Sequence, residues 1–176
     1  MSQEMYASFP LRLKAFLIDY VLIFAYLIVL AIVGVLFAPV VRPLFSGSLV
    51  VAQLSGFLTV TLPVSLYYIA SETRFGGQSF GKRKAGIRAT AADGGAIALP
   101  RSVLRTALKF LPWELSHFLV YRLVAVGEGD VPTQYALVGG LVYALMFAYL
   151  LSAIFTKRKQ ALYDLVAGTQ VVKTSA

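Results

Sequence analysis

The stretch that decides the fold is AFLIDYVLIFAYLIVLAIVGVLFAPVV, which runs from Ala15 to Val41 and holds one charged residue, Asp19. About 27 residues at ~1.5 Å each reach about 40 Å as a helix, which exceeds the hydrocarbon thickness of a bilayer. Few soluble helices are so apolar on every side. Arg12 and Lys14 stand just before it. We interpret this stretch as a membrane span that contains a carboxylate, and such a group is costly enough to need a partner or a function.

The composition of the whole chain is typical of an integral membrane protein. Of its 176 residues, 59% are hydrophobic and 14% are charged, and the mean hydropathy is +0.77. The net charge of +8 would indicate nucleic acid in a soluble protein. Here the basic residues lie between apolar segments, which favours a topology signal and contact with anionic lipids instead. Cysteine is absent, so disulfides and thiolate metal sites are excluded.

The apolar pattern predicts a single domain over residues 1–176, an all-α membrane protein built as a bundle of about four transmembrane helices. The spans are expected near residues 13–38, 49–70, 111–126 and 135–155. The third of these holds several polar residues, so three spans plus a half-inserted helix remain the alternative. Within the second span, Pro63 is expected to kink the helix and to leave a carbonyl that neighbouring groups satisfy.

Residues 72–100 are predicted to form a cytoplasmic loop with a small β-hairpin. Gly86–Ala91 and Ala96–Leu99 are short β-compatible runs, and the Asp-Gly pair between them is a turn signal. Thr169–Lys173 is another β-leaning run that could add a third strand, since a lone hairpin is marginal.

Residues 101–111 are predicted to form an amphipathic helix at the membrane surface, ending at Pro112. Its basic residues are spaced four apart and so share one face. Together with the cluster in the preceding loop they form a predicted basic surface for lipid headgroups, made of Lys82, Arg83, Lys84, Arg101, Arg105 and Lys109.

The distribution of charge predicts the topology. With four spans, the clusters Lys82–Lys84 and Lys157–Lys159 share a side with Arg12, and the acidic loop Glu128–Asp130 faces the other way. Because basic residues accumulate on the cytoplasmic side, we expect a multi-pass protein of the bacterial inner membrane with both termini in the cytoplasm.

Three separate motifs resemble the RDD family of membrane proteins. They are Arg12-Leu-Lys-Ala-Phe-Leu-Ile-Asp19, then Gly77-Gln-Ser-Phe-Gly-Lys-Arg83 with the basic residues that follow, and finally Lys159-Gln-Ala-Leu-Tyr-Asp164. The family is named for one arginine and two aspartates, which correspond here to Arg12, Asp19 and Asp164. Tyr163 departs from the pattern, because many members carry histidine there. The resemblance implies a membrane protein for which transport has been proposed, including cation/proton antiport in some members, whereas a eukaryotic relative acts as an assembly component.

Arg12, Asp19 and Asp164 form the predicted triad. Arg12 and Asp19 are seven residues apart, so they share a helical face about 10 Å apart along the axis, and Asp164 follows a basic cluster expected on the same side. One interpretation is that the two aspartates bind a cation or exchange a proton. The other is a charge network that locks the first helix to the C-terminal helix, and it has weight because arginine lowers a carboxylate's pKa.

Glu114 and His117 form a possible secondary polar pair, since residues three apart face the same way on a helix. The pair alone has too few ligands for a metal, so a hydrogen-bonded pair beside Trp113 at the headgroup level is the favoured interpretation. The chain has one histidine and no zinc motif. We therefore predict no metal, no cofactor and no enzymatic activity.

Two functions remain open from the sequence. The first is a transporter of a small ion or solute, such as a monovalent cation/proton antiporter, in which a chain this short would form a homo-oligomer to enclose a pathway. The second is a scaffold that transports nothing and binds a membrane protein partner or anionic lipid through the basic region between Gly77 and Lys109.

Overall fold

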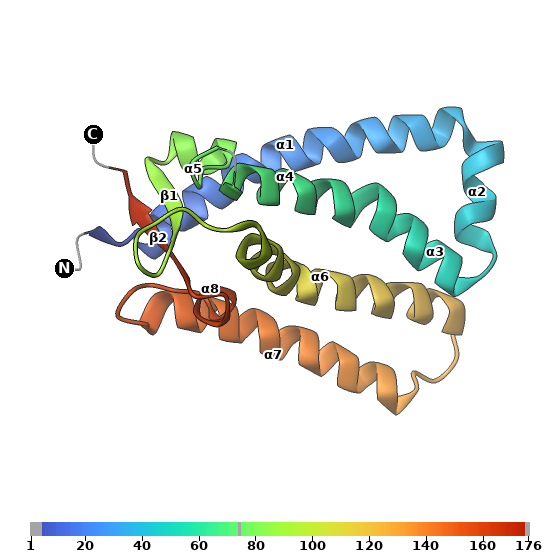
Figure 1. Cartoon of the computed structure of the whole chain (residues 1–176). Coiled ribbons are helices and arrows are strands. Elements are labelled where there is room, and N and C mark those ends of the chain that lie inside the picture. Colours follow the sequence, from blue (N-terminus) through green and yellow to red (C-terminus); the bar gives the residue numbers. More distant parts are fainter. Residues whose placement is uncertain (1–4, 74, 175–176) are drawn as a thin grey trace.

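The computed structural model describes residues 5–73 and 75–174. Four long helical rods lie side by side, and two short helices and two strands gather at one end of them (Figure 1). We call that end the charged end. The elements in chain order are α1 (Phe9–Leu36), α2 (Ala38–Ser46), α3 (Leu49–Gly56), the π-helical turn η2 (Phe57–Thr61), α4 (Leu62–Thr73), α5 (Phe80–Lys84), β1 (Ile87–Ala91), α6 (Leu99–Val126), α7 (Thr133–Phe155), α8 (Leu162–Val166) and β2 (Thr169–Lys173).

Three of the rods are long and apolar enough to cross a bilayer. They are α1, the continuous α3–η2–α4 rod and α7, and they correspond to the spans predicted near residues 13–38, 49–70 and 135–155. Their apolar side chains are largely exposed, with Val35 at 76% and Phe155 at 77%. In water such a surface would aggregate, whereas in a bilayer it faces lipid. The chain is therefore a membrane protein with three candidate spans in the described residues.

The fourth rod, α6, corrects one prediction. A surface helix ending at Pro112 was expected, followed by a separate segment, but α6 is one helix of 28 residues with Pro112 inside it. It packs between the α3–η2–α4 rod and α7 (Figure 1). Its length of about 42 Å would reach across a bilayer, but its charged residues distinguish it from the three candidate spans, so four spans remain a prediction.

Two prolines inside the rods, Pro63 and Pro112, each free a carbonyl that a tyrosine from a neighbouring helix then bonds. A proline lacks the N–H that would bond the carbonyl four residues earlier, so Pro63 frees Thr59 O and Pro112 frees Leu108 O. The Tyr26 hydroxyl donates to the first at 2.5 Å, and the Tyr149 hydroxyl donates to the second at 2.6 Å. The prediction that neighbours satisfy the carbonyl freed by Pro63 is confirmed. Instead of a simple kink, the π-helical turn η2 lies just before Pro63.

The predicted hairpin is wrong. The sheet has two antiparallel strands, β1 and β2, which lie far apart in the sequence and pair from Ile87↔Lys173 to Ala91↔Thr169. Residues 96–98 run directly into α6 instead of returning as a strand. Two β-branched residues of β2, Val171 and Val172, are buried, whereas residues 96–98 contribute one, Ile97, which packs in the core outside any strand.

The well-packed core sits at the charged end rather than along the rods. Ala15 of α1 packs there with buried side chains of the sheet and its flanking segments, including Ile87 and Val171. The N-terminal arm joins the sheet, since Ala7 N donates to Val171 O at 3.0 Å. Both ends of the described chain are thus fixed beside the ends of the rods, and this brings residues near position 12 next to residues near position 164.

Candidate functional site

Asp164 lies at the centre of a buried charge network at the charged end. Its carboxylate is fully buried, and it forms ion pairs with Arg12 Nη1 at 2.7 Å and Arg105 Nη2 at 2.8 Å. Burial alone would raise the pKa of Asp164, but the two guanidinium groups outweigh burial and hold that pKa at about 2. Asp164 is therefore an ionised structural anion throughout the physiological pH range.

Glu72 extends the network from the end of α4. It is 2% exposed and pairs with Arg105, and it accepts further hydrogen bonds from Lys82 Nζ and Ser102 Oγ, each at 3.1 Å. Burial lowers the pKa of the Lys82 ammonium, while the neighbouring Glu72 carboxylate acts in the opposite direction. Glu72 was not among the predicted site residues. The signal that could have found it is its place as a charge at the end of an otherwise uncharged span.

Asp19 is held by neutral donors. It is 2% exposed and accepts hydrogen bonds from Tyr67 Oη at 2.9 Å, from Ser79 Oγ at 2.5 Å and from the Gly81 N–H at 2.7 Å. Two of these donors lie in or next to the short helix α5, and the third lies on α4. Asp19 thus fastens α5 and α4 to α1, and no ion pair to it occurs within residues 5–73 and 75–174.

Close packing supports the Asp19 contacts. A Cβ on Gly81 would overlap the Ala15 carbonyl and approach the Asp19 carboxyl carbon, so only glycine allows α5 this near to α1. Gly77, with φ +80°, lies in the same way against the backbone of Ala89. Both glycines belong to the motif at residues 77–83, and their role there is to allow close backbone packing.

The predicted triad is thus only partly assembled. Arg12 and Asp164 form a direct ion pair, whereas Asp19 pairs with neither of them. Arg12, Asp19 and Arg105 do line one shared cavity of about 70 Å³ at the charged end. Tyr163, at the position where many family members carry histidine, also lines this cavity. Burial raises the pKa of Tyr163 to about 12, so this side chain does not exchange protons near neutrality.

The residues of the predicted basic surface differ in exposure. Arg83, Lys84 and Arg101 are exposed, so they can meet lipid headgroups. The expectation fails for Lys82 and Arg105, which are buried in ion pairs. Lys109 is partly buried, with its ammonium 3.3 Å from the centroid of the Tyr68 ring. A stripe of basic residues on a helix can meet lipid or buried carboxylates, and spacing alone does not distinguish these cases.

Glu114 and His117 lie together farther along α6. His117 Nδ1 is 3.4 Å from Glu114 Oε1, the two side chains are 26% and 24% exposed, and the Trp113 and His117 rings are 4.8 Å apart. The Thr61 hydroxyl, at the end of the π-helical turn, donates to the Glu114 carboxylate.

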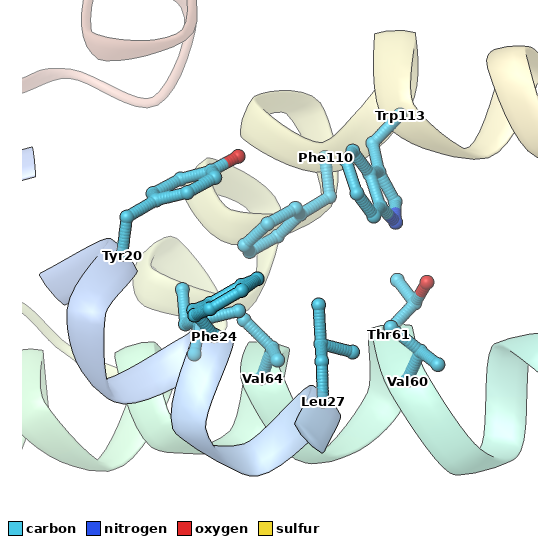
Figure 2. A pocket seen from close by; sticks show the side chains of 9 residues that line it. Tyr20, Phe24, Leu27, Val60, Thr61, Val64, Phe110 and Trp113 are labelled. Carbon is cyan, nitrogen blue, oxygen red and sulfur yellow. The ribbon is translucent and has the colours of Figure 1, made fainter. Parts of the chain in front are cut away.

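An apolar pocket of about 110 Å³ lies between α1, the α3–η2–α4 rod and α6. Figure 2 shows Thr61 and Trp113 at one side of it and Tyr20 and Phe24 at the other. Thr61 and Trp113 thus connect the pocket to the group around Glu114.

These contacts belong to a line of polar pairs between α6 and the α3–η2–α4 rod, which we call the polar seam. It begins at the charged end and runs to the opposite end of the rods. The pairs, each with its α6 member first, are Arg105 with Glu72, Lys109 with Tyr68, Glu114 with Thr61, and Arg122 with Gln53 at 3.1 Å. Polar groups at a helix interface within a membrane either hold the helices together or mark a path for ions.

Among the described residues, no group of three or more histidine, cysteine or acidic side chains is placed to hold a metal ion.

Comparison with known sequences gives one match. A sequence model of the RDD family matches residues 6–168, nearly the whole chain, including all three triad positions. No curated protein and no solved structure matches the chain.

Proposed function

Because the chain belongs to the RDD family and is a membrane protein, we propose that it moves a small ion or solute across the bilayer, with protons as the coupled ion. Exchange of a monovalent cation for protons is the proposed reaction. We further propose that the protein lies in the bacterial inner membrane with four spans, forms a homo-oligomer, and has no enzymatic activity, no cofactor and no nucleic-acid partner.

The polar seam is the observation that supports transport. Ionisable side chains within a membrane are costly, and they commonly mark paths for ions and protons. Here they follow one helix interface from Glu72 to Arg122 and pass beside the apolar pocket near Glu114. The π-helical turn lies against the middle of this seam, and such turns are frequent at functional sites.

Within the seam, Glu114 is the group we assign to proton exchange. A carboxylate that exchanges protons near neutrality must not be held ionised by nearby cations. Asp164 and Glu72 are each ion-paired to Arg105, so they fail this condition. Glu114 has a hydroxyl donor and the imidazole of His117 beside it instead. Asp19 has only neutral donors and meets the same condition, but its contacts give it an anchoring role.

The charged end is proposed to face the cytoplasm. The exposed basic residues Arg83, Lys84 and Lys157 lie in segments at that end, and Glu128 and Asp130 lie exposed in the connection between α6 and α7 at the other. With α6 as the fourth span, this arrangement obeys the positive-inside rule and places both termini inside.

Replacing Glu114 with glutamine is expected to abolish cation-driven proton movement in vesicles that hold the purified protein. Glutamine keeps the size and can still accept from Thr61, but it cannot release a proton. The measurement is the quenching of a pH-sensitive dye after sodium or potassium is added outside. Glu128→Gln, an exposed change in the connection between α6 and α7, is the matched control and should transport normally. Asp19→Asn reports separately whether that carboxylate takes part.

Normal flux in Glu114→Gln would remove Glu114 from the mechanism, and silent wild-type vesicles for every ion tried would count against transport. A scaffold that transports nothing would then be the better supported of the two functions. Exposed Arg83, Lys84 and Arg101 form the basic part available to a membrane protein partner or to anionic lipid. For a scaffold we expect a partner to copurify and to be lost when Arg83 and Lys84 are neutralised.

A further inference from the structure

The cavity at the charged end is lined by an excess of positive charge. Four basic residues contribute to its wall, and Asp19 is the one acidic residue that does. The basic residues are Arg12, Lys82, Arg105 and Lys109. They come from α1, α5 and α6, so the cavity is formed where separate parts of the chain meet.

Counting the carboxylates around these four cations leaves one positive charge without a partner. The three acids are Asp19, Glu72 and Asp164, and the last two form all the ion pairs in this network within the described residues. Lys109 and Asp19 both lie outside these ion pairs: the Lys109 ammonium contacts the face of the Tyr68 ring, and Asp19 accepts hydrogen bonds from neutral donors only. The cluster as a whole keeps a net positive charge, and net positive charge at a low-dielectric site favours the binding of an anion.

A second donor in the wall is also unused. Arg12 gives its Nη1 to Asp164, while its Nη2 is buried and has no hydrogen-bond partner among the described residues. Buried donors are nearly always satisfied, so an orphaned guanidinium nitrogen indicates a missing acceptor. The unused Nη2 and the Lys109 ammonium both belong to residues that line the same cavity.

We propose that this cavity binds one phosphate group, through the Lys109 ammonium and Arg12 Nη2. Arginine and lysine are the side chains that recognise phosphate, one by directed donors and the other as a point charge. The volume of about 70 Å³ compares with about 10–15 Å³ needed for one water by the same measure, so it has room for the group. The phosphate comes either from solution or from a lipid headgroup.

A lipid headgroup could reach the cavity from the side of α1, because one residue of the cavity wall is exposed there. Phe16 lines the cavity and is 41% exposed on α1, at the level where that helix enters the charged end. Free phosphate would need no such lateral approach. The site does not depend on transport, since a scaffold with the same charges would bind the same group.

The test uses the full chain purified in an uncharged detergent, with inorganic phosphate as the probe in titration calorimetry at constant ionic strength. Native mass spectrometry of the same sample, prepared with phosphatidylglycerol, reports a retained headgroup. Lys109→Met is expected to weaken binding of the probe, or retention of the lipid, by about tenfold or more. Lys84→Met, an exposed cation outside the cavity, is the matched control and should change neither.

A second variant guards against misfolding. Arg12→Lys can keep the ion pair with Asp164 but loses Nη2 and the Nε hydrogen bond to Ala7 O, so it should bind phosphate more weakly, while its unfolding temperature without phosphate should fall far less than that of Asp164→Ala. Phosphate binding lost in Lys109→Met identifies the free anion. Lipid retention lost in that variant, with no phosphate binding, identifies the headgroup. Absence of both in the wild type, or equal loss in the Lys84 control, would overturn the proposal.

Discussion

Asp164→Ala is expected to lower the free energy of unfolding by about 3–5 kcal/mol, because it leaves two buried guanidinium groups without their shared anion. Asp164 is fully buried and pairs with both Arg12 and Arg105, so its loss uncouples α1, α6 and α8 at once. The measurement is an SDS titration of the purified protein in detergent micelles. Asp130→Ala, which removes an exposed acid from the connection between α6 and α7, is the control and should shift the midpoint little.

The dependence of stability on acid pH tests the same ion pairs of Asp164 independently. The pKa of Asp164 is about 2 in the folded protein against an ordinary value of 3.8, so the unfolded chain binds the proton first as pH falls. The stabilisation is therefore complete above about pH 4 and is lost as pH falls towards 2. The Asp164→Ala variant should lack this part of the pH dependence. A wild-type titration in which stability does not fall between pH 4 and 2 would contradict the ion-pair assignment.

Gly81→Ala is expected to destabilise the protein by about 1–3 kcal/mol through overpacking, and by more if α5 leaves α1 altogether. The added methyl group would overlap the Ala15 carbonyl, which is backbone and cannot move aside as a flexible side chain can. Displacement of α5 would also break the hydrogen bonds that the Gly81 N–H and Ser79 hydroxyl donate to Asp19.

Gly140→Ala is the matched control for this change. Gly140 lies within α7 with nothing near its added methyl group, so alanine should be neutral or slightly stabilising there through its higher helix propensity. The same SDS titration applies to both variants. An unfolding midpoint for Gly81→Ala equal to that of the wild type would show that α5 does not depend on this close contact.

The sequence predicted the parts of the fold that depend on local apolar patterning. Long apolar runs indicate the three candidate spans, since each is long enough and apolar enough to cross a bilayer. The expectation that both ends of the chain lie on one side predicted a cluster of Arg12, Asp19 and Asp164, of which the structure joins Arg12 and Asp164 in an ion pair. The family resemblance located the residues but not their contacts.

The sequence did not predict contacts between residues far apart. Glu72 meets Arg105 across 33 positions, and nothing local to either residue marks the pair. The same limitation explains the wrong hairpin, because three helices, α6, α7 and α8, separate β1 from its partner strand in the sequence. Pro112 by itself predicts a helix end, because the Tyr149 hydroxyl that satisfies the carbonyl it frees comes from another helix. Each miss involves a partner that only the tertiary structure supplies.

The proline–tyrosine contacts in the rods have a consequence for how this protein tolerates sequence change. In hydrocarbon no water can take over an exposed carbonyl, so Pro63 and Tyr26 act as one unit, as do Pro112 and Tyr149. Restoring an ordinary residue at either proline would return the carbonyl to its own helix, so the hydrogen bond from the tyrosine would no longer be needed to satisfy it. Substitutions at these four positions should therefore be inherited in pairs, and chains that lack one member should also lack the other.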